Sequence, residues 1–316
     1  MSELMTMDIA EDEIFLSPWL KAGSISMVYA KRGVGKTWFC LSLMLAISRG
    51  MQFGNWDVEK PVNCLYIDGE MSISDIKTRL SRLSETLPAE LANITVLSND
   101  LMRQKSKVWL DLSDTEWRRE VSLFLARSDY KVVFIDNVAS LTPGLIENDK
   151  ENWDPVNQWL LWLRSLGLAV IIVHHEGKKD GPRGTSGRED ALDYSIKLST
   201  PTGHSAKDGA KFRIDFTKAR GICGQAAESF TLSIETVNGQ LAWATSVSED
   251  TKRHAVISLL GSGIPQKYIP QQAGCSKGLV SRYKKQAIEA GFLDANGLFT
   301  PAGRKKYAAD DILGIG

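Results

Sequence analysis

The sequence predicts an α/β fold: a doubly wound, mostly parallel sheet with antiparallel strands at one edge, followed by a small helical domain. Short, continuously apolar runs alternate with helical stretches up to about residue 200, which is typical of a parallel sheet covered on both faces. Beyond that point, two strand-like runs flank Asn238-Gly239, a pair typical of antiparallel hairpins. A polar stretch at 246–252 then leads into a separate C-terminal part.

The expected elements follow one another in a regular order. Parallel strands are predicted at 24–30, 62–67, 94–97, 131–136 and 168–174. Helices are predicted between them at 37–49, 73–87, 114–126 and 154–166, and edge strands at 211–217, 230–235 and 240–244. We therefore divide the chain into an α/β body, residues 1–248, and a C-terminal domain, residues 249–316.

The composition is that of an ordinary soluble globular protein, with 43% hydrophobic and 24% charged residues in a chain of 316. The four cysteines form no C-x-x-C pair, which argues against a disulfide framework and against a zinc site. The acidic N-terminus is unlike a signal peptide, and the apolar runs are too short to cross a bilayer. We expect a cytoplasmic protein with no membrane partner.

The net charge of zero is unevenly distributed. Residues 251–316 carry ten Lys and Arg against four Asp and Glu, whereas the rest of the chain carries 28 against 34. A basic domain on a mildly acidic body suggests a polyanion such as DNA as the partner of that domain. A solvated basic surface is the alternative, and charge alone does not decide between them.

Residues 30–37 have the spacing of a phosphate-binding loop, with Ala30 in place of the first glycine. The loop follows an apolar strand and opens a helix, so its backbone amides and the helix N-terminus can hold the phosphates of ATP. Lys36 is expected to reach the β- and γ-phosphates, and the Thr37 hydroxyl to hold Mg²⁺. The predicted nucleotide contacts are Ala30, Lys31, Arg32, Gly33, Val34, Gly35, Lys36, Thr37 and Trp38.

Two more strands are predicted to deliver carboxylates to the same sheet edge, where ligands of open α/β sheets collect. Asp136 ends the apolar run 132–136 and is expected to serve the Mg²⁺ site; a turn-capping aspartate is the alternative. Asp68 and Glu70 follow the strand at 62–67, and we expect Glu70 to accept a proton from the attacking water. An exposed loop glutamate is the alternative there. Ser72 and Asp75 have the spacing of a helix cap.

The strand at 168–174 brings His174 and His175 to this edge. A hydrogen bond from such a residue can sense the γ-phosphate, and we favour His174 for this role over a purely structural one. The loop that follows carries Lys178, Lys179 and Arg183, which either face DNA or form a solvated charged loop.

Lys218 and Arg220 follow the first edge strand and point the same way along it. They either reach into the nucleotide site of a neighbouring subunit, as cationic fingers that stabilise transition-state charge, or form a surface pair. The residues alone do not decide between these two roles.

The ordered set of these motifs resembles the RepA-type hexameric replicative helicases of plasmids and their AAA-type relatives, which belong with DnaB-type helicases and RecA. The resemblance covers residues 15–245 and rests mainly on the segments 30–37, 66–71, 133–137, 174–178, 183–193 and 218–221. It implies a RecA-like fold and a homo-oligomeric ring, with six subunits as the expected number and ATP between subunits. It further implies catalytic roles for Lys36 and Glu70, a γ-phosphate sensor at His174, and trans-acting fingers at Lys218 and Arg220. Ala30 and the additional C-terminal domain depart from the family pattern.

The C-terminal domain is predicted to be a winged helix. Helices are expected at 252–260 and 266–273, and a third is capped by Ser276 and stopped by Gly291. The third helix is basic, as in helix-turn-helix proteins that enter a major groove, with Lys277, Arg282, Lys284 and Lys285 as candidate DNA contacts. The wing is expected at 292–300, and protein binding is the alternative use of this domain.

These features favour an ATP-hydrolysing DNA motor: a helicase, or a helicase-like replication factor, of a plasmid, phage or integrated element. A regulatory ATP switch for partition or transcription is one alternative. Lys31 occupies the position of a lysine typical of ParA-type partition ATPases, but Arg32 interrupts their pattern. A RecA-like recombinase is the other alternative.

Overall fold

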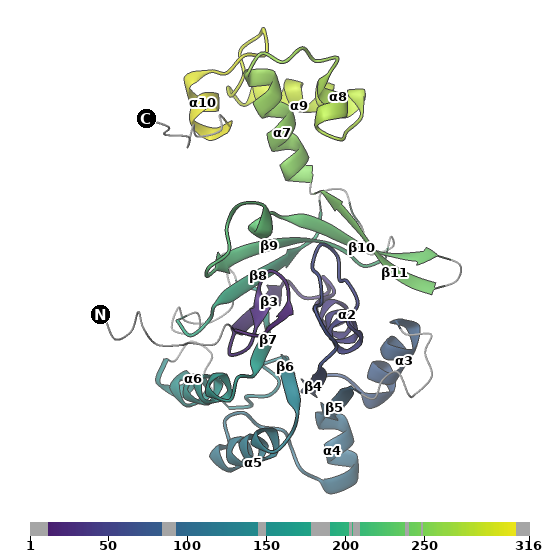
Figure 1. Cartoon of the computed structure of the whole chain (residues 1–316), viewed down its shortest axis with the longest axis vertical. Coiled ribbons are helices and arrows are strands. Elements are labelled where there is room, and N and C mark those ends of the chain that lie inside the picture. Colours follow the sequence, from purple (N-terminus) through teal and green to yellow (C-terminus); the bar gives the residue numbers. More distant parts are fainter. Residues whose placement is uncertain are drawn as a thin grey trace. The chain divides into compact units, whose positions relative to one another are not determined.

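The computed structural model describes residues 12–83, 93–144, 150–177, 190–201, 204, 209–237, 240–247 and 249–307. The chain divides into two compact units, Met1–Thr245 and Ser246–Gly316, which are considered separately (Figure 1). The predicted loop residues Lys178, Lys179 and Arg183, and the turn Asn238-Gly239, lie outside the described residues.

The first unit is built on a sheet of nine strands, in the order β11-β10-β9-β8-β3-β7-β6-β4-β5 (Figure 1). Parallel pairing joins β3 (Ile25–Ala30), β4 (Asn63–Asp68), β5 (Ile94–Ser98), β6 (Tyr130–Asp136), β7 (Ala169–His175) and β8 (Tyr194–Ser199). The strands β9 (Lys211–Ala219) and β10 (Phe230–Val237) continue the sheet in antiparallel pairing, and β11 (Gln240–Val247) follows them. Because the chain winds to both sides of β3, the predicted doubly wound α/β fold is confirmed.

Helices cover both faces of the sheet. The helix α2 (Lys36–Arg49) shares one core with alternate residues of the strands, such as Val132 and Phe134 of β6. The intervening residues Val133 and Ile135 lie in a second core, with α5 (Thr115–Ala126) and α6 (Lys150–Ser165). Burial on both faces is the reason that the parallel strands are apolar without interruption.

Several short elements do not appear among the sequence predictions. These are the ribbon β1 (Ile14–Leu16) and β2 (Leu20–Lys21), the strand β8, the helix α4 (Asn99–Ser106) and the C-terminal helix α10 (Pro301–Tyr307). The ribbon strands are too short to show a period, and β8 carries polar Ser195 and Lys197 among its apolar residues. The helix α3 (Ile73–Leu83) begins where predicted; residues 84–87 lie outside the described part.

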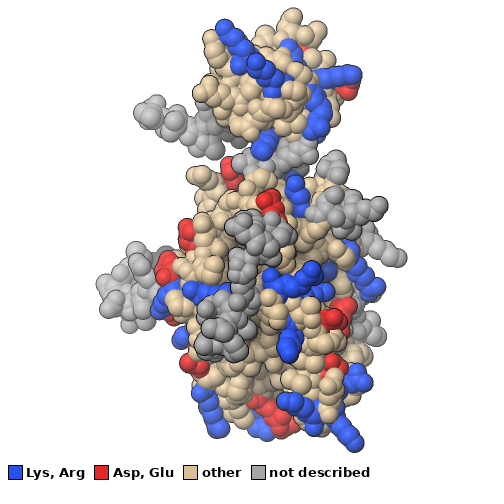
Figure 2. All heavy atoms as spheres, turned by 90° about the vertical axis from the view of Figure 1, so that its right-hand side faces the viewer, with Lys and Arg blue, Asp and Glu red and all other residues tan. Residues whose placement is uncertain are grey.

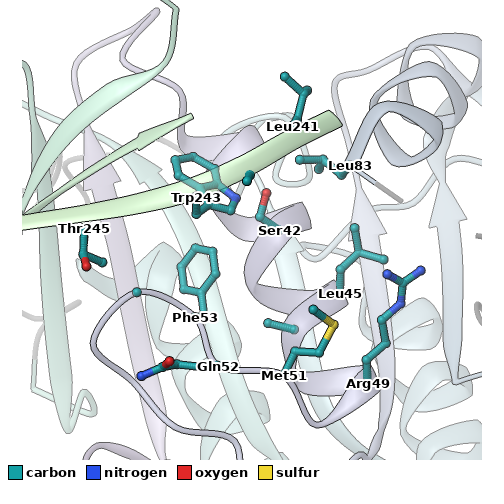
Figure 3. A pocket seen from close by; sticks show the side chains of 13 residues that line it. Ser42, Leu45, Arg49, Met51, Gln52, Phe53, Leu83, Leu241, Trp243 and Thr245 are labelled. Carbon is teal, nitrogen blue, oxygen red and sulfur yellow. The ribbon is translucent and has the colours of Figure 1, made fainter. Parts of the chain in front are cut away.

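The strand β11 packs beside α2. Trp243 lies against Phe53 and Phe212, with ring centroids 5.8 Å and 5.4 Å apart. A cavity of about 400 Å³ remains between β11, the end of α2 and the segment 51–54, and its labelled lining mixes apolar side chains with polar ones such as Arg49 and Gln52 (Figure 3). It shares no lining residue with the cavity at the phosphate loop described below.

The second unit contains α7 (Glu249–Gly261), α8 (Ile269–Gln272), α9 (Lys277–Glu289) and α10, with a single antiparallel bridge between Leu293 and Phe299. The predicted cap of the third helix is confirmed, since the Ser276 hydroxyl accepts a 3.2 Å hydrogen bond from the Leu279 amide. A small apolar core holds the unit together, including Val256, Ile257, Ile269, Val280, Tyr283, Ala287 and Tyr307. Crossing a bilayer would require a long apolar helix, and the described residues contain none.

Candidate nucleotide site

The phosphate loop connects β3 to α2 and takes its shape from two glycines. Gly33 and Gly35 have φ angles of 80° and 115°, in the region that side chains disfavour, and Gly35 is the N-cap of α2. The first amides of a helix lack intrahelical partners and carry the positive end of the helix dipole. The loop therefore presents donors to an anion. Ala30 is not at positive φ, so alanine is tolerated at that position.

Lys36, the first residue of α2, is only 7% exposed. Its ammonium lies 3.4 Å and 3.5 Å from the carbonyl oxygens of Ala30 and Lys31, and 3.2 Å from His175 Nδ1. Burial lowers its pKa, and the charge of Asp136 opposes that effect. A cation held here by carbonyl oxygens suits a polyphosphate.

Asp136 ends β6 and is buried, with 4% exposure. Its carboxylate accepts hydrogen bonds from the Thr37 hydroxyl and, at 2.6 Å, from the Tyr66 hydroxyl. Burial raises the pKa of Asp136, whereas these two hydrogen bonds and the Lys36 ammonium lower it. A hydroxyl and a carboxylate in contact are ligands that fit Mg²⁺, which takes few protein ligands and completes its shell with phosphate and water.

Glu70 is held on the other side of the cavity by backbone and side-chain contacts. The Gly69 amide donates to the Asp136 carbonyl oxygen at 2.8 Å, which ties the strand ends together. Asp68 Oδ1 accepts hydrogen bonds from the amides of Glu70 and Met71 at 3.1 Å and 2.7 Å. Asn137 Nδ2 donates to Glu70 Oε2. The predicted base is thus exposed to the cavity in a fixed position.

Asp68 differs from Glu70 in its surroundings. It is 1% exposed, and burial together with the charge of Asp136 raises its pKa to about 7. The amides of Met71 and Glu70 oppose this shift. Asp68 therefore shapes the turn that carries Glu70.

The two histidines occupy different environments. The His175 ring lines the cavity, within 3.2 Å of Lys36 Nζ and 3.5 Å of Asn137 Nδ2. His174 is 1% exposed and does not line it; its Nδ1 accepts the His175 amide at 2.8 Å. The sequence favoured His174 for phosphate sensing, whereas it is the His175 ring that lines the cavity. Alternation along β7 is the cause, because His175 shares the α2 face with Ile171 and Val173.

The cavity bounded by these residues has a volume of about 640 Å³. Ala30, Lys31 and Val34 do not line it. The sequence analysis assigned no site role to Asn137 or to Arg79, whose guanidinium carbon lies 5.2 Å from the Trp38 ring centroid. The helical spacing of Ser72, Asp75 and Arg79 is a signal that could have found the arginine. The lining consists of Arg32, Gly33, Gly35, Lys36, Thr37, Trp38, Asp68, Glu70, Met71, Ser72, Asp75, Arg79, Asp136, Asn137 and His175.

Lys218 and Arg220 are not brought to this cavity. The strand register places Ala219 beside Tyr194, and Tyr194 beside Ser26 at the start of β3. The phosphate loop leaves the C-terminal end of β3. Lys218 and Arg220 therefore lie at the opposite end of the strands, where β3 begins. Arg220 is half-exposed and makes a long 3.4 Å ion pair with Asp193.

The candidate DNA contacts of the second unit lie on α9. Lys277, Arg282 and Lys285 are exposed. Lys284 is partly buried beside Gly297, where an added Cβ would lie 2.9 Å from its Cε.

The fold and this site define a RecA-like P-loop ATPase. Residues 5–181, more than half of the chain, match the model of a family described as an AAA domain, and the chain belongs to that family. Membership implies nucleotide binding, usually with Mg²⁺.

Solved structures show the same fold at low sequence identity. A KaiC-like protein from Pyrococcus horikoshii OT3 aligns with a TM-score of 0.51 and 13% identity, over 73% of this chain and 93% of that one. The flagellar accessory protein FlaH from Methanocaldococcus jannaschii aligns with a TM-score of 0.50 and 13% identity, over 71% and 91% of the two chains. Among curated proteins, none matches the sequence significantly.

Proposed function

We propose that the protein is an ATP-hydrolysing DNA motor, a helicase or helicase-like replication factor of a plasmid, phage or integrated element, that works as a homo-oligomeric ring with six subunits as the expected number. The observation that carries this proposal is the position of Lys218 and Arg220, at the sheet edge opposite the phosphate loop of their own chain. Cations placed there serve a nucleotide held by a neighbouring subunit. Hydrolysis then depends on assembly, as a motor requires.

The side chains nearest the phosphate loop and the strand ends have the following roles in this proposal. The loop amides and Lys36 bind the β- and γ-phosphates of ATP. Thr37 and Asp136 hold Mg²⁺, which neutralises phosphate charge when bound. Glu70 accepts a proton from the attacking water, and Asn137 holds the Glu70 carboxylate by the hydrogen bond described above.

His175 is the residue that we assign to sensing the γ-phosphate. It lies between Lys36 and Asn137, so a phosphate at Lys36 competes for the same hydrogen-bonding groups. Lys178 follows three residues further along the chain, in the loop that also carries Lys179 and Arg183 and for which we propose contact with DNA. A change at His175 therefore has a short covalent path to that loop.

The second unit supports DNA as the partner. The exposed cations of α9 lie off its buried stripe of Val280, Tyr283 and Ala287. Lys and Arg side chains gather over this unit on the face drawn in Figure 2. The helices α8 and α9 are joined by a short turn through Gly274, the arrangement of a helix-turn-helix, and we propose that α9 enters a major groove.

A mixing experiment tests the trans arrangement. Lys36→Ala destroys phosphate binding but keeps the fingers, and Lys218→Ala/Arg220→Ala keeps the phosphate loop but removes the fingers. Each variant alone should bind single-stranded DNA yet hydrolyse ATP at least about a hundredfold more slowly than wild type. Their mixture should recover a measurable fraction of the DNA-stimulated rate, because some interfaces combine an intact loop with intact fingers.

If the finger variant alone retains wild-type turnover, the proposal fails. A filament-forming recombinase shares the trans arrangement, and electron microscopy with ATP and DNA separates closed rings from helices. The switch alternative predicts that Lys31→Ala loses hydrolysis as Lys36→Ala does. Lys31 is exposed and does not line the cavity of its own chain.

A further inference from the structure

Residues 103–109, the basic-aromatic segment, are exposed without interruption. Trp109 is 56% exposed and Val108 43%. The Arg103 guanidinium carbon lies 4.3 Å from the Trp109 ring centroid, and Lys105 and Lys107 add two further cations. Trp109 has the largest exposed fraction among the exposed large hydrophobic residues of the described part of the chain.

The local backbone holds this segment out from the body of the unit. Lys107 caps α4 in the left-handed region, with φ 54°, and its amide donates to the Arg103 carbonyl oxygen at 3.2 Å. The chain therefore turns sharply before Val108 and Trp109. Leu110, directly after the tryptophan, is 1% exposed, and its amide donates to Asn99 Oδ1 at 3.1 Å. The segment thus runs from the last turn of α4 into a short loop that ends at the buried Leu110.

The cations of the segment are available. Within the described part of the chain, Arg103, Lys105 and Lys107 enter no ion pair with a carboxylate. Cations interleaved with an exposed aromatic ring match a strand whose phosphates repeat beside unpaired bases. Duplex DNA keeps its bases stacked and offers the indole no face.

We infer that the basic-aromatic segment binds single-stranded nucleic acid, with a base stacked on Trp109 and phosphates at Arg103, Lys105 and Lys107. This inference rests on the proposed function, since it names the part of the ATPase body that contacts the strand. It concerns a surface distinct from α9 and from the loop that begins at Lys178.

The residues on either side of the segment contact the chain near Glu70. On one side, Asp100 Oδ2 accepts the amide of Ile73, the first residue of α3, at 3.0 Å. On the other side, the Leu112 amide donates to the Leu141 carbonyl oxygen at 2.6 Å. The Leu141 side chain packs against Gly69, where an added Cβ would lie 2.6 Å from Leu141 Cγ. A bound nucleic-acid strand that moves the segment therefore also moves the neighbours of Glu70. We expect such binding to raise the rate of ATP hydrolysis.

The test uses the full-length protein and a fluorescein-labelled oligo(dT), with affinity read by anisotropy. Trp109→Ala should weaken binding about fivefold or more, the lower end of what one base–aromatic stack contributes. Trp109→Phe, which keeps a ring, should retain most of the affinity. Lys105→Gln/Lys107→Gln should reduce the slope of log affinity against log salt by about 1.4, for two lost phosphate contacts. Basal hydrolysis should be unchanged, and its stimulation by oligo(dT) reduced in proportion to binding.

Phe124→Ala is the matched control, because Phe124 is 51% exposed on α5 of the same unit. It should leave oligo(dT) affinity unchanged. If Trp109→Ala and the double lysine variant bind and respond to oligo(dT) as wild type does, the inference is overturned while the motor stands. It is overturned as well if these variants alter only the oligomeric state, which would make the segment a subunit contact. Binding that depends on Trp109 without any stimulation supports the strand-binding role of the segment but contradicts both its coupling to Glu70 and the motor.

Discussion

The Tyr66 hydroxyl donates a 2.6 Å hydrogen bond to the Asp136 carboxylate, and both groups are buried. Neighbouring strands supply the two residues, and the Tyr66 ring stacks on Phe134 with centroids 5.7 Å apart. The ring cannot turn away, so the hydroxyl fixes one oxygen of the carboxylate. Tyr66 of β4 thus helps to position Asp136, which ends β6. The sequence analysis assigned Asp136 to the Mg²⁺ site from the pattern of β6 alone.

Tyr66→Phe should weaken the response to Mg²⁺. The variant keeps the stacked ring but removes the hydrogen bond that favours the ionised carboxylate, so more Mg²⁺ is needed for half-maximal hydrolysis, by about threefold to tenfold. The measurement is ATPase rate against Mg²⁺ concentration. Tyr29→Phe is the control, because the Tyr29 hydroxyl bonds Thr217 instead. Equal Mg²⁺ curves for wild type and Tyr66→Phe would show that the hydrogen bond has no such role.

Glu70→Gln should separate ATP binding from hydrolysis. The amide keeps the size of the side chain but accepts no proton from water, so kcat should fall by about 10²-fold to 10⁴-fold while ATP affinity stays near wild type. Asn137→Ala should cause a smaller loss, about tenfold, because it frees the Glu70 carboxylate without removing it. Single-turnover hydrolysis and equilibrium titration provide the two quantities. A Glu70→Gln protein that turns over normally would remove Glu70 from the chemistry.

Asp68 should make the folded protein less stable as pH rises. Its pKa is about 7 when folded and near 4 when unfolded, so between those values the unfolded chain loses a proton that the folded chain keeps. Stability is therefore lost as pH rises through this window, by an amount on the order of 4 kcal/mol when the window is crossed completely.

Urea unfolding at pH 5 and at pH 8 tests this sign. Asp68→Asn keeps an oxygen acceptor for the amides of Glu70 and Met71 but does not ionise. The variant should gain stability relative to wild type as pH rises from 5 to 8. If the free energies of unfolding of wild type and Asp68→Asn changed with pH in parallel, Asp68 would be ionised in the folded protein at both pH values.

Much of the fold could be predicted because its signals are local. An uninterrupted apolar run means a strand buried on both faces, and the glycines, lysine and threonine of the phosphate loop stand next to each other in the chain. The edge at which Asp136 and Glu70 meet follows from parallel strand direction alone.

The remaining features depend on tertiary contacts. That His175 lines the cavity and His174 does not depends on which face of β7 meets α2. The contact between Arg79 and Trp38 joins α3 to α2; the helical spacing of Asp75 and Arg79 indicates a shared face of α3, but not which residue of α2 that face meets. The strand β8 is stabilised by its neighbours β3 and β9 although polar residues interrupt its pattern.

Gly303→Ala should destabilise the second unit. An added Cβ at Gly303 would lie 1.8 Å from the carbonyl oxygen of Phe292, so α10 must move away from the unit's core. A loss of about 1–3 kcal/mol is expected for such overpacking. Gly278→Ala is the control: it lies exposed in α9 without close neighbours, and alanine there should stabilise the helix slightly. Thermal unfolding of the full chain compares the Gly303→Ala and Gly278→Ala variants. Equal melting temperatures would contradict the packing described for α10.

Isothermal titration of wild type and Lys36→Ala with Mg-ATP tests the central claim most directly. The buried ammonium of Lys36 and the glycine-shaped loop are what make this cavity a triphosphate site. Wild type should bind with a clear heat signal, and Lys36→Ala should bind at least about a hundredfold more weakly, as expected from losing a charge-assisted contact with the phosphates. Equal affinities for the two proteins would contradict nucleotide binding at this loop.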